Sequence, residues 1–278
     1  MTWLAELDLQ YRRDERGSTL LQHQHRGPLR IFKSLYPEGP GVCHNVIVHP
    51  PGGLVQGDRL EIRARVGPGA HALVSTPGAT RFYRNASGDP AEQRVRLALE
   101  AGARLEWLPL ETLAYDGCQA LNRVELAIAP GAELLAWDIV CLGLPAAGLP
   151  FASGCLEQQW QWPGVWLERA RIDAADQRLL QSPLGLAGQS AIATLVLACG
   201  TPLGRARRER LLESCRALIE AHELAPRCGA SCPNDHMLVV RALGSQVEPL
   251  MQLWQALWAL LRRQAWGLAD SPPRIWSV

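Results

Sequence analysis

The sequence predicts a mainly β protein whose body is a stack of β units, with two α-helices in the last third of the chain. Three observations support this: an internal repeat with strand alternation, further strand-like runs, and two C-terminal segments with helical spacing. No Gly/Ser-rich or Pro-rich linker divides the chain. We therefore expect a single domain over residues 1–278, β-rich over about 1–200 and helical over about 201–278.

The internal repeat is the strongest observation. Segments 62–73, 95–108 and 124–137 each place apolar residues at every second position, followed by a turn and a second apolar run. The turn glycines are Gly69, Gly102 and Gly131, which are 33 and 29 residues apart. Alternation with period two is typical of strands with one buried face, and Gly permits the positive φ of a tight turn. The repeat predicts stacked β units, either a β-solenoid or a meander folded into a sandwich.

Other segments complete the expected elements. Strand-like apolar runs cover residues 45–49, 165–172 and 192–198. Residues 205–223 and 246–266 carry apolar side chains at helical spacing, and the second of these has a wide face with Trp254 and Trp258. Pro226 and Gly229 separate the two predicted helices.

Composition excludes several classes of protein. The 278 residues are 47% hydrophobic and 20% charged, which is typical of a globular chain. A net charge of +1 gives no reason to expect nucleic acid or an anionic membrane as partner. The N-terminus does not read as a signal peptide, and the apolar runs are shorter than the ~20 residues of a membrane span. Eight cysteines in such a chain indicate reduced thiols and a cytoplasmic location.

Two sets of residues could carry chemistry. Cys228, Cys232 and His236 have the ligand types and spacing of a zinc or nickel site on a helical face, although Pro233 interrupts a helix there and ordinary loop thiols explain them as well.

Three aspartates form the second set. Asp58 follows a glycine-rich turn, Asp116 follows Tyr115, and Asp138 is a single charge in an apolar strand. An unpaired buried charge is costly, so Asp138 is either exposed or held for a reason. For Asp58, hydrogen bonding to the backbone of its own turn is the alternative to a functional role.

Five ordered motifs carry a resemblance to a known family. They are His49-Pro-Pro-Gly-Gly-Leu-Val-Gln-Gly-Asp58 and the segments 76–84, 105–113, 134–143 and 273–276. Together they resemble the urease accessory protein UreD family, called UreH in some organisms, from about residue 20 to the C-terminus. The motif residues that we single out are His49, Gly52, Gly53, Gly57, Arg81, Tyr83 and Arg84.

The resemblance implies a non-catalytic maturation factor. Members bind apo-urease and recruit UreF, which carries the GTPase UreG, and the accessory complex can be a dimer. The implied fold is a right-handed β-helix-like body with a pair of helices. Ni²⁺ is implied to pass through the protein in transit, with no tightly bound cofactor or stable metal. Asp58 and Asp138 match acidic positions associated with that path, and Glu38 is a looser match.

One stretch departs from the family pattern. After residues 134–138 the family usually has an arginine and a glutamate where this chain has Leu144 and Leu149. A role assigned to that charged pair is therefore in doubt here, and its joint loss is consistent with mutual neutralisation.

The predicted C-terminal helix carries more apolar surface than one packing face needs. We expect Trp254, Trp258, Arg274 and Trp276 to contribute to a partner interface, with burial of both helical tryptophans in the core as the alternative.

Two other functions stay open on sequence grounds. One is a β-helix carbohydrate-active enzyme in which two of Asp58, Asp116 and Asp138 face one groove as an acid/base pair. The other is a subunit-interface protein without a metal path.

Overall fold

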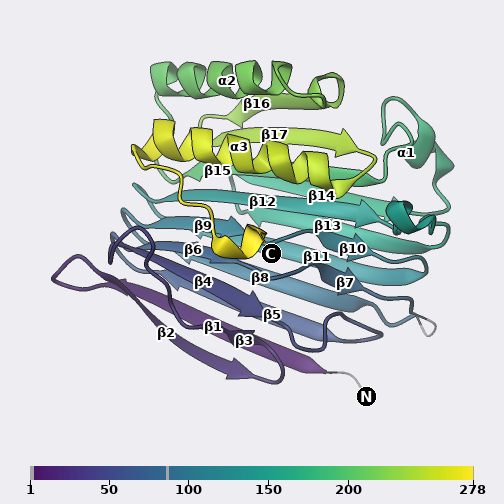
Figure 1. The fold of residues 1–278 in the computed structure, drawn as a ribbon, viewed down its shortest axis with the longest axis horizontal. Coiled ribbons are helices and arrows are strands. Elements are labelled where there is room, and N and C mark those ends of the chain that lie inside the picture. Colours follow the sequence, from purple (N-terminus) through teal and green to yellow (C-terminus); the bar gives the residue numbers. More distant parts are fainter. Residues whose placement is uncertain (1–2, 86–87, 278) are drawn as a thin grey trace.

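The computed structural model describes residues 3–85 and 88–277, which fold into two stacked β-sheets with a helical layer on one of them (Figure 1). The seven-stranded sheet has the order β14-β13-β11-β8-β5-β1-β2. Its strands are β1 Leu4–Arg13, β2 Thr19–Arg26, β5 Arg59–Val66, β8 Ala91–Leu99, β11 Cys118–Ile128, β13 Gly154–Trp162 and β14 Trp166–Asp173.

The ten-stranded sheet has the order β16-β17-β15-β12-β9-β6-β4-β3, with β10 beside β12 and β7 beside β10. Its strands are β3 Arg30–Ile31, β4 Val42–Val48, β6 His71–Ser75, β7 Thr80–Phe82, β9 Arg104–Leu108, β10 Thr112–Ala114, β12 Glu133–Leu142, β15 Ala191–Cys199, β16 Cys228–Asn234 and β17 Met237–Gly244. The helices are α1 Gln177–Gln181, α2 Arg205–Glu220 and α3 Val247–Trp266, with short 3₁₀ turns at Pro145–Ala147, Ala225–Arg227 and Arg274–Ser277.

The sequence repeat is the solenoid coil. Its first strands, β5, β8 and β11, pair in parallel, and Ile62, Val95 and Val124 lie side by side in register. Each coil then turns into the ten-stranded sheet as β6, β9 or β12, which also pair in parallel. A meander would give antiparallel neighbours. The structure therefore confirms the β-solenoid of the two arrangements that the sequence left open.

The two ends of the solenoid differ in their connections. At one end, the repeat glycines stack on one another: a Cβ added to Gly131 would lie 3.5 Å from the backbone nitrogen of Gly102, and both residues have positive φ. The positive φ of these turns is what favours glycine at each of them. The longer connections, from β4 to β5, from β6 to β8, from β9 to β11 and from β12 to β13, lie at the opposite end, which we call the loop end. Two of them contain the short strands β7 and β10.

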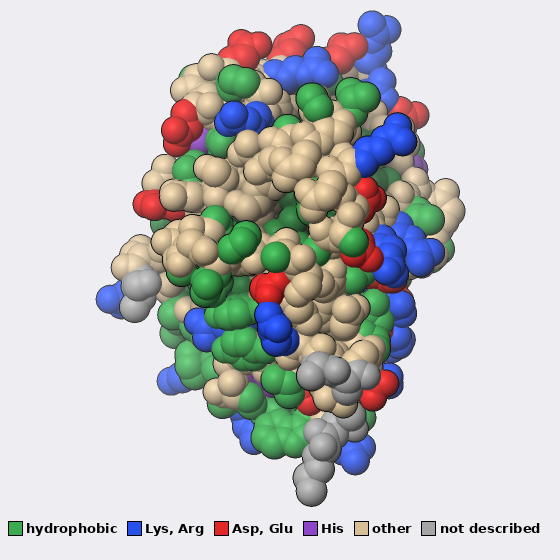
Figure 2. Space-filling model, turned by 90° about the vertical axis from the view of Figure 1, so that its right-hand side faces the viewer, with side chains coloured by type: hydrophobic (Ala, Val, Ile, Leu, Met, Phe, Trp, Pro, Cys, Tyr) green, Lys and Arg blue, Asp and Glu red, His purple; other side chains and the backbone are tan. Residues whose placement is uncertain are grey.

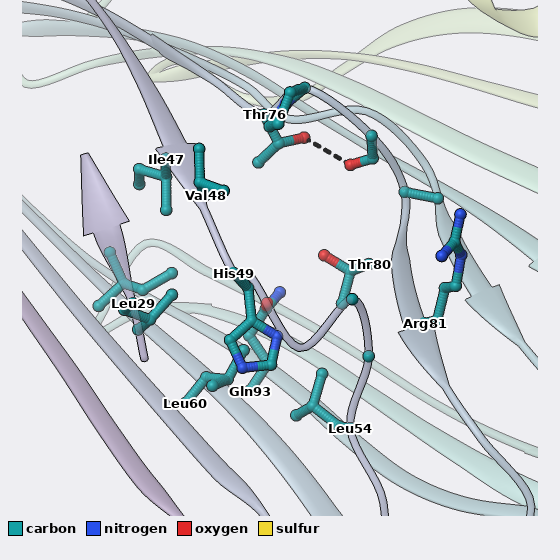
Figure 3. A pocket seen from close by; sticks show the side chains of 16 residues that line it. Leu29, Ile47, Val48, His49, Leu54, Leu60, Thr76, Thr80, Arg81 and Gln93 are labelled. Carbon is teal, nitrogen blue, oxygen red and sulfur yellow. Dashed lines mark hydrogen bonds between the residues drawn. The ribbon is translucent and has the colours of Figure 1, made fainter. Parts of the chain in front are cut away.

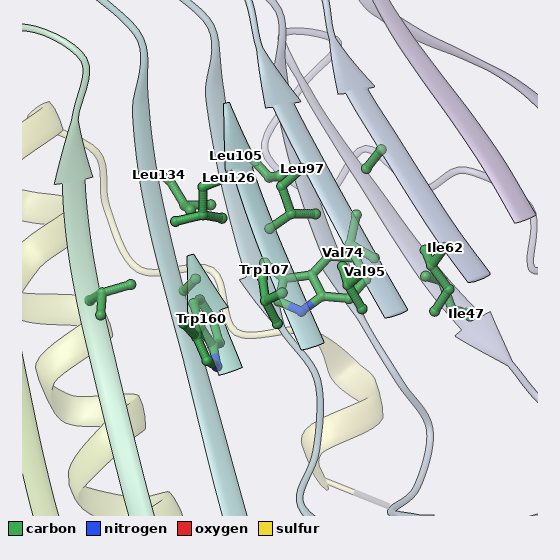
Figure 4. Packing of buried hydrophobic residues seen from close by; sticks show 14 of the residues in the cluster. Ile47, Ile62, Val74, Val95, Leu97, Leu105, Trp107, Leu126, Leu134 and Trp160 are labelled. Carbon is green, nitrogen blue, oxygen red and sulfur yellow. The ribbon is translucent and has the colours of Figure 1, made fainter. Parts of the chain in front are cut away.

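Between the sheets lies an apolar core to which every coil contributes. Trp107 from the ten-stranded sheet and Trp160 from the seven-stranded sheet are each 5% exposed and fill its centre among leucines and valines (Figure 4). A second core lies on the other face of the ten-stranded sheet, under α3. Figure 1 shows α3 lying across this sheet, with α2 beyond it next to β16.

Both helical tryptophans are core residues. Trp254 is 0% and Trp258 1% exposed, and both face the ten-stranded sheet. A side chain with no accessible surface cannot contact a partner, so the expectation that these two tryptophans form an interface is wrong. The wide apolar face of α3 is explained by the sheet and α2, which it packs against simultaneously.

The C-terminal part is less helical than predicted. The two helices form where expected, but the residues between them form the hairpin β16–β17, which extends the ten-stranded sheet next to β15. Strand β17 is an apolar run buried on both faces, with Met237 and Val239 in one core and Leu238 and Val240 in the other. Such a run lacks the alternation that identifies a half-buried strand.

Candidate functional site

A cavity of about 210 Å³ opens at the loop end (Figure 3). Its rim comes from two of the family-like motifs, through His49, Gly52 and Gly53 of one loop and Thr76, Thr80 and Arg81 of another. Its inner wall includes Leu60, Ile62 and Gln93, whose side chains point into the space between the sheets. The cavity therefore leads from the surface toward the interior of the solenoid.

The motif glycines bring these two loops together. A Cβ on Gly53 would lie 2.3 Å from the Tyr83 ring, so only glycine fits under that ring. Leu54 exchanges backbone hydrogen bonds with the strand beside it, donating to the Arg81 carbonyl at 2.7 Å and accepting from the Tyr83 amide at 3.0 Å. Gly52 and Gly57 have positive φ, as tight turns require.

A row of polar side chains continues inward from the cavity. Gln93, Asn122 and Gln158 are register partners on β8, β11 and β13 and face the core. Gln93 donates to Asn122 Oδ1 at 3.4 Å, and Gln158 donates across the gap between the sheets to Asp138 Oδ2 at 2.6 Å. Buried amides are costly unless they are paired. We call these four residues the polar row.

Asp138 ends the polar row on β12. It points to the same side as Leu134 and Ala136, that is, into the space between the sheets. Burial raises the pKa of Asp138 to about 6, and the Glu168 carboxylate acts in the same direction, whereas hydrogen bonds from Trp160 and Gln158 oppose the rise. Asp138 is thus a carboxyl group whose charge is poorly compensated by its surroundings.

Asp58 lies outside this row and binds its own turn. Its carboxylate accepts hydrogen bonds from the backbone amides of Val55 at 3.0 Å and Trp3 at 3.1 Å. It lines a separate cavity beside Trp3 and Glu92, in which neither Asp116 nor Asp138 takes part. Its negative charge also acts on His49, whose pKa it tends to raise.

Glu38 belongs to a buried charge network under α3, which we call the α3 network. Its carboxylate contacts Arg262 Nη2 at 2.5 Å and His44 Nε2 at 2.6 Å. Arg262 continues to Glu106, 3.2 Å from Nε, and Glu106 also binds His71 and the Trp258 indole. Both guanidinium and imidazole contacts lower the pKa of Glu38, although burial opposes them. The polar row and Glu38 are thus separate features, on opposite faces of the ten-stranded sheet.

Asp116 is fixed by its neighbours at the loop end. It pairs with Arg84 and accepts hydrogen bonds from the Ser153 hydroxyl at 2.9 Å and from the amides of Ser153 at 2.7 Å and Ala152 at 3.0 Å, which together lower its pKa. Next to it, the rings of Tyr83 and Tyr115 pack edge to face at 4.8 Å. The three aspartates thus have three different environments: a turn, a loop anchor and the interior. This does not match an acid/base pair facing one groove.

Leu144 and Leu149 face each other across a short antiparallel bridge. Each donates a backbone hydrogen bond to the other, at 2.7 and 3.1 Å. Directly opposed side chains in such a bridge lie close together. Side chains of opposite charge at these two positions would therefore be close enough to pair.

The C-terminal residues cover part of the helix layer. Trp276 packs on Trp137 and Trp258 with ring centroids 5.2 Å apart, and its indole donates to Ser75 Oγ at 3.0 Å. Trp276 is half-buried and Arg274 is exposed, so of the four predicted interface residues these two have surface available to a partner.

The cysteine set does not form a helical face. Cys228 and Cys232 lie on strand β16, and the His236 ring contacts the Cys199 carbonyl at 2.8 Å. Within the part of the chain that the structure describes, no three His, Cys, Asp or Glu side chains converge as metal ligands would. Among the helices of residues 3–85 and 88–277, none is long and apolar enough to cross a membrane.

Sequence reasoning missed the amides of the polar row. Gln93 and Asn122 each stand nine residues before a repeat glycine, where the first repeat has Leu60. The sequence does contain a signal for them, because polar residues stand at positions of the repeat where the alternation places apolar, core-facing side chains.

Comparison with known proteins gives a consistent result. The family model described as "UreD urease accessory protein" matches residues 4–277. The urease accessory protein UreD of Albidiferax ferrireducens is 56% identical over 278 residues, covering 100% of both chains. The proteins of the same name from Polaromonas sp. and Paracidovorax citrulli are each 54% identical over 278 residues, again with 100% of both chains covered.

Proposed function

The chain belongs to the UreD family of urease accessory proteins, and we propose that it acts as a scaffold in urease maturation. In this role it binds apo-urease and recruits UreF, which brings UreG. It also conducts Ni²⁺ toward the urease active site. The observation that carries the conducting role is the polar row, which continues from the loop-end cavity into the core and ends at Asp138.

The chemistry of the polar row suits passage rather than storage. Ni²⁺ prefers imidazole and thiolate to carboxylate and amide oxygen. Amide oxygens and one carboxylate therefore attract the ion without holding it in a deep site, which conduction requires. Neighbouring strands lie about 4.8 Å apart, so successive amides are close enough to hand over an ion with its waters.

The test is co-expression of this chain with the urease subunits, UreF and UreG, followed by pull-down and nickel analysis of the urease. Replacement of Asp138 by Ala should leave the complexes intact and lower the nickel content of urease. Asp58→Ala combined with it should lower the content further if both carboxylates lie on the path. Intact complexes with normal nickel would instead support a subunit-interface protein without a metal path.

A further inference from the structure

The part of the ten-stranded sheet beyond α3 has an apolar outer face. On β4, Ile47 belongs to the core between the sheets, so Val46 and Val48, at the alternate positions, face outward. Both are half-buried. The Phe32 amide donates to the Val46 carbonyl at 3.0 Å, which continues the antiparallel register of β3 and β4, and Phe32 is 53% exposed.

Leu35 extends this apolar face. It forms an antiparallel bridge with His44, and residues opposite each other in such a bridge point to the same side. His44 contacts Glu38 of the α3 network at 2.6 Å, so it points to the outer face. Leu35 therefore faces outward as well, and it is also 53% exposed. We call Phe32, Leu35, Val46 and Val48 the open strip.

The helical layer stops short of the open strip. Figure 1 shows α3 lying over β12, β15 and β17, while the C-terminal turn reaches β6. There the Trp276 indole donates to Ser75, the register partner of Val46. From β6 to β3 is two strand spacings, or about 10 Å, which is the width of an α-helix with its side chains. The open strip thus offers the space of one further helix beside α3.

The other sheet shows how a solvated face of this protein is built. The outward positions of the seven-stranded sheet carry charged side chains, as in the register row of Asp8, Arg63 and Arg96. A sheet face in contact with water is normally polar. The open strip departs from this rule, and exposed apolar surface of this kind marks a contact with another protein.

The charges beside the open strip select the kind of helix that fits it. Lys33 follows Phe32 in the chain, and Arg274 belongs to the C-terminal turn. Both are exposed, and neither pairs with a carboxylate of the described residues. Glu38, the next carboxylate along the chain from Lys33, is already bound within the α3 network. A helix with acidic residues along its edges therefore complements the strip.

We propose that the open strip binds an amphipathic helix of UreF, with apolar side chains against the strip and acidic residues toward Lys33 and Arg274. The inference rests on the proposed function, in which UreF is a direct partner. Val48 also lines the loop-end cavity, so a partner in the strip stands beside the opening from which the polar row leads inward. UreF brings UreG to the chain, whereas urease receives the ion, and this place therefore belongs to UreF.

Titration of UreF onto the complex of the chain with apo-urease tests the strip. Phe32→Asp and Leu35→Asp should each weaken UreF binding at least about tenfold. Leu167→Asp, at a residue 61% exposed on β14, is the matched control and should not. Apo-urease should bind all three variants, which also shows that they fold. Unchanged UreF binding by both strip variants would overturn the proposal, and loss of urease binding with UreF binding intact would assign the strip to urease instead.

The charges of the strip are tested by salt. Lys33→Glu should weaken UreF binding several-fold at low ionic strength and much less at high ionic strength, because salt screens exposed charges. Arg65→Glu, at an exposed residue of β5, is the control and should have no effect. Equal effects of the two substitutions would contradict an acidic partner at this place.

Photo-crosslinking identifies the occupant directly. p-Benzoylphenylalanine in place of Phe32 or of Leu35 should attach to UreF on irradiation of the co-expressed complex. The attached UreF residues should recur at a spacing of three or four, as on one face of a helix. Attachment to urease or to a second copy of this chain, or a spacing of two, would overturn the proposal. If the unaltered chain binds neither UreF nor apo-urease, the proposed function itself fails.

Discussion

At the residue scale, Asp138 shows how the fold sets the properties of a carboxyl group. The strand carries it into the space between two sheets, where an amide donor is its nearest partner and a second carboxylate lies within electrostatic reach. Neither partner supplies positive charge. The residue is therefore held at a free-energy cost that a purely structural role does not explain.

Replacement of Asp138 by Asn should stabilise the protein in a pH-dependent way. A pKa of about 6 in the folded chain, against an ordinary 3.8, means that ionisation is penalised in the folded state. The resulting loss in the free energy of unfolding is negligible below about pH 4 and grows as the pH rises toward 6. Above that pH it stays constant at about 3 kcal/mol at most. Urea denaturation at pH 4 and pH 8 should show Asp138→Asn more stable than the unaltered chain only at pH 8. Equal stability at both values would contradict the buried environment of this carboxyl.

Two substitutions of Asp58 can distinguish a role of its negative charge from a role of its hydrogen bonds in the turn. Asp58→Ala removes the acceptor for two backbone amides and should destabilise the fold by about 1 kcal/mol. Asp58→Asn keeps an acceptor oxygen and should cost less. If nickel delivery falls equally with both, the charge matters; if it follows stability, Asp58 serves the turn. Thermal denaturation and nickel content of urease are the two measurements.

At the scale of elements, α3 is held to the ten-stranded sheet by tryptophan packing and by the α3 network. Trp258 takes part in both, since its ring packs in the core and its indole donates to Glu106 at 2.5 Å. Arg262 is 0% exposed and sits between Glu106 and Glu38. The helix is thus an integral layer of the domain.

Trp258→Ala should unfold or strongly destabilise the chain, because truncation of a buried tryptophan costs about 3–5 kcal/mol. The effect appears in urea denaturation of the chain, with no UreF present. The surface residue Arg274 provides the control: Arg274→Ala should leave stability unchanged, and loss of UreF binding with it would assign that residue to the interface. A stable Trp258→Ala protein would show that α3 is not part of the core.

The α3 network allows a double-mutant test. Arg262→Met leaves two buried carboxylates without their cation and should cost about 3–5 kcal/mol. Glu106→Gln in the same chain removes one of those charges and should recover part of the loss, which additive effects would not give. Urea midpoints of the two single variants and the double variant decide between coupling and independence.

At the scale of the whole molecule, connection lengths distinguish an end with short turns from the loop end. The repeat glycines stack on one another at one end, while the loops at the other end carry several of the motifs, the cavity and the anchor at Asp116. Figure 2 views this end and shows hydrophobic side chains gathered over its lower part. Large side chains that are more than half exposed include Trp3, Phe32, Leu35, Leu149 and Leu184.

Exposed apolar side chains such as these favour aggregation when no partner protein covers them. The chain expressed alone should aggregate, and co-expression with UreF should increase the soluble fraction, as measured by size-exclusion chromatography. A monodisperse monomer at high concentration would contradict the scaffold role.

The sequence by itself determined the strands of the repeat and the two C-terminal helices, but not whether those strands form a solenoid or a meander. Alternation around Ile62, Val95 and Val124 identifies strands because each strand buries one face, and a turn glycine marks where each coil reverses. These are local properties, so the chain displays them without its fold. The family motifs are equally readable, since His49 and Gly53 stand in unbroken runs of sequence.

Only the tertiary structure decided which residues share an environment. Asp138 and Gln158 meet because two sheets stack, and Glu38 and Arg262, 224 residues apart, meet because α3 crosses the first coils. The direction of a side chain follows from period and register, but its partner lies on a strand or helix that the local pattern does not specify. For the same reason, the sequence suggests that the apolar face of α3 contacts a partner protein. The structure shows that this face is covered by the ten-stranded sheet, which buries Trp254 and Trp258.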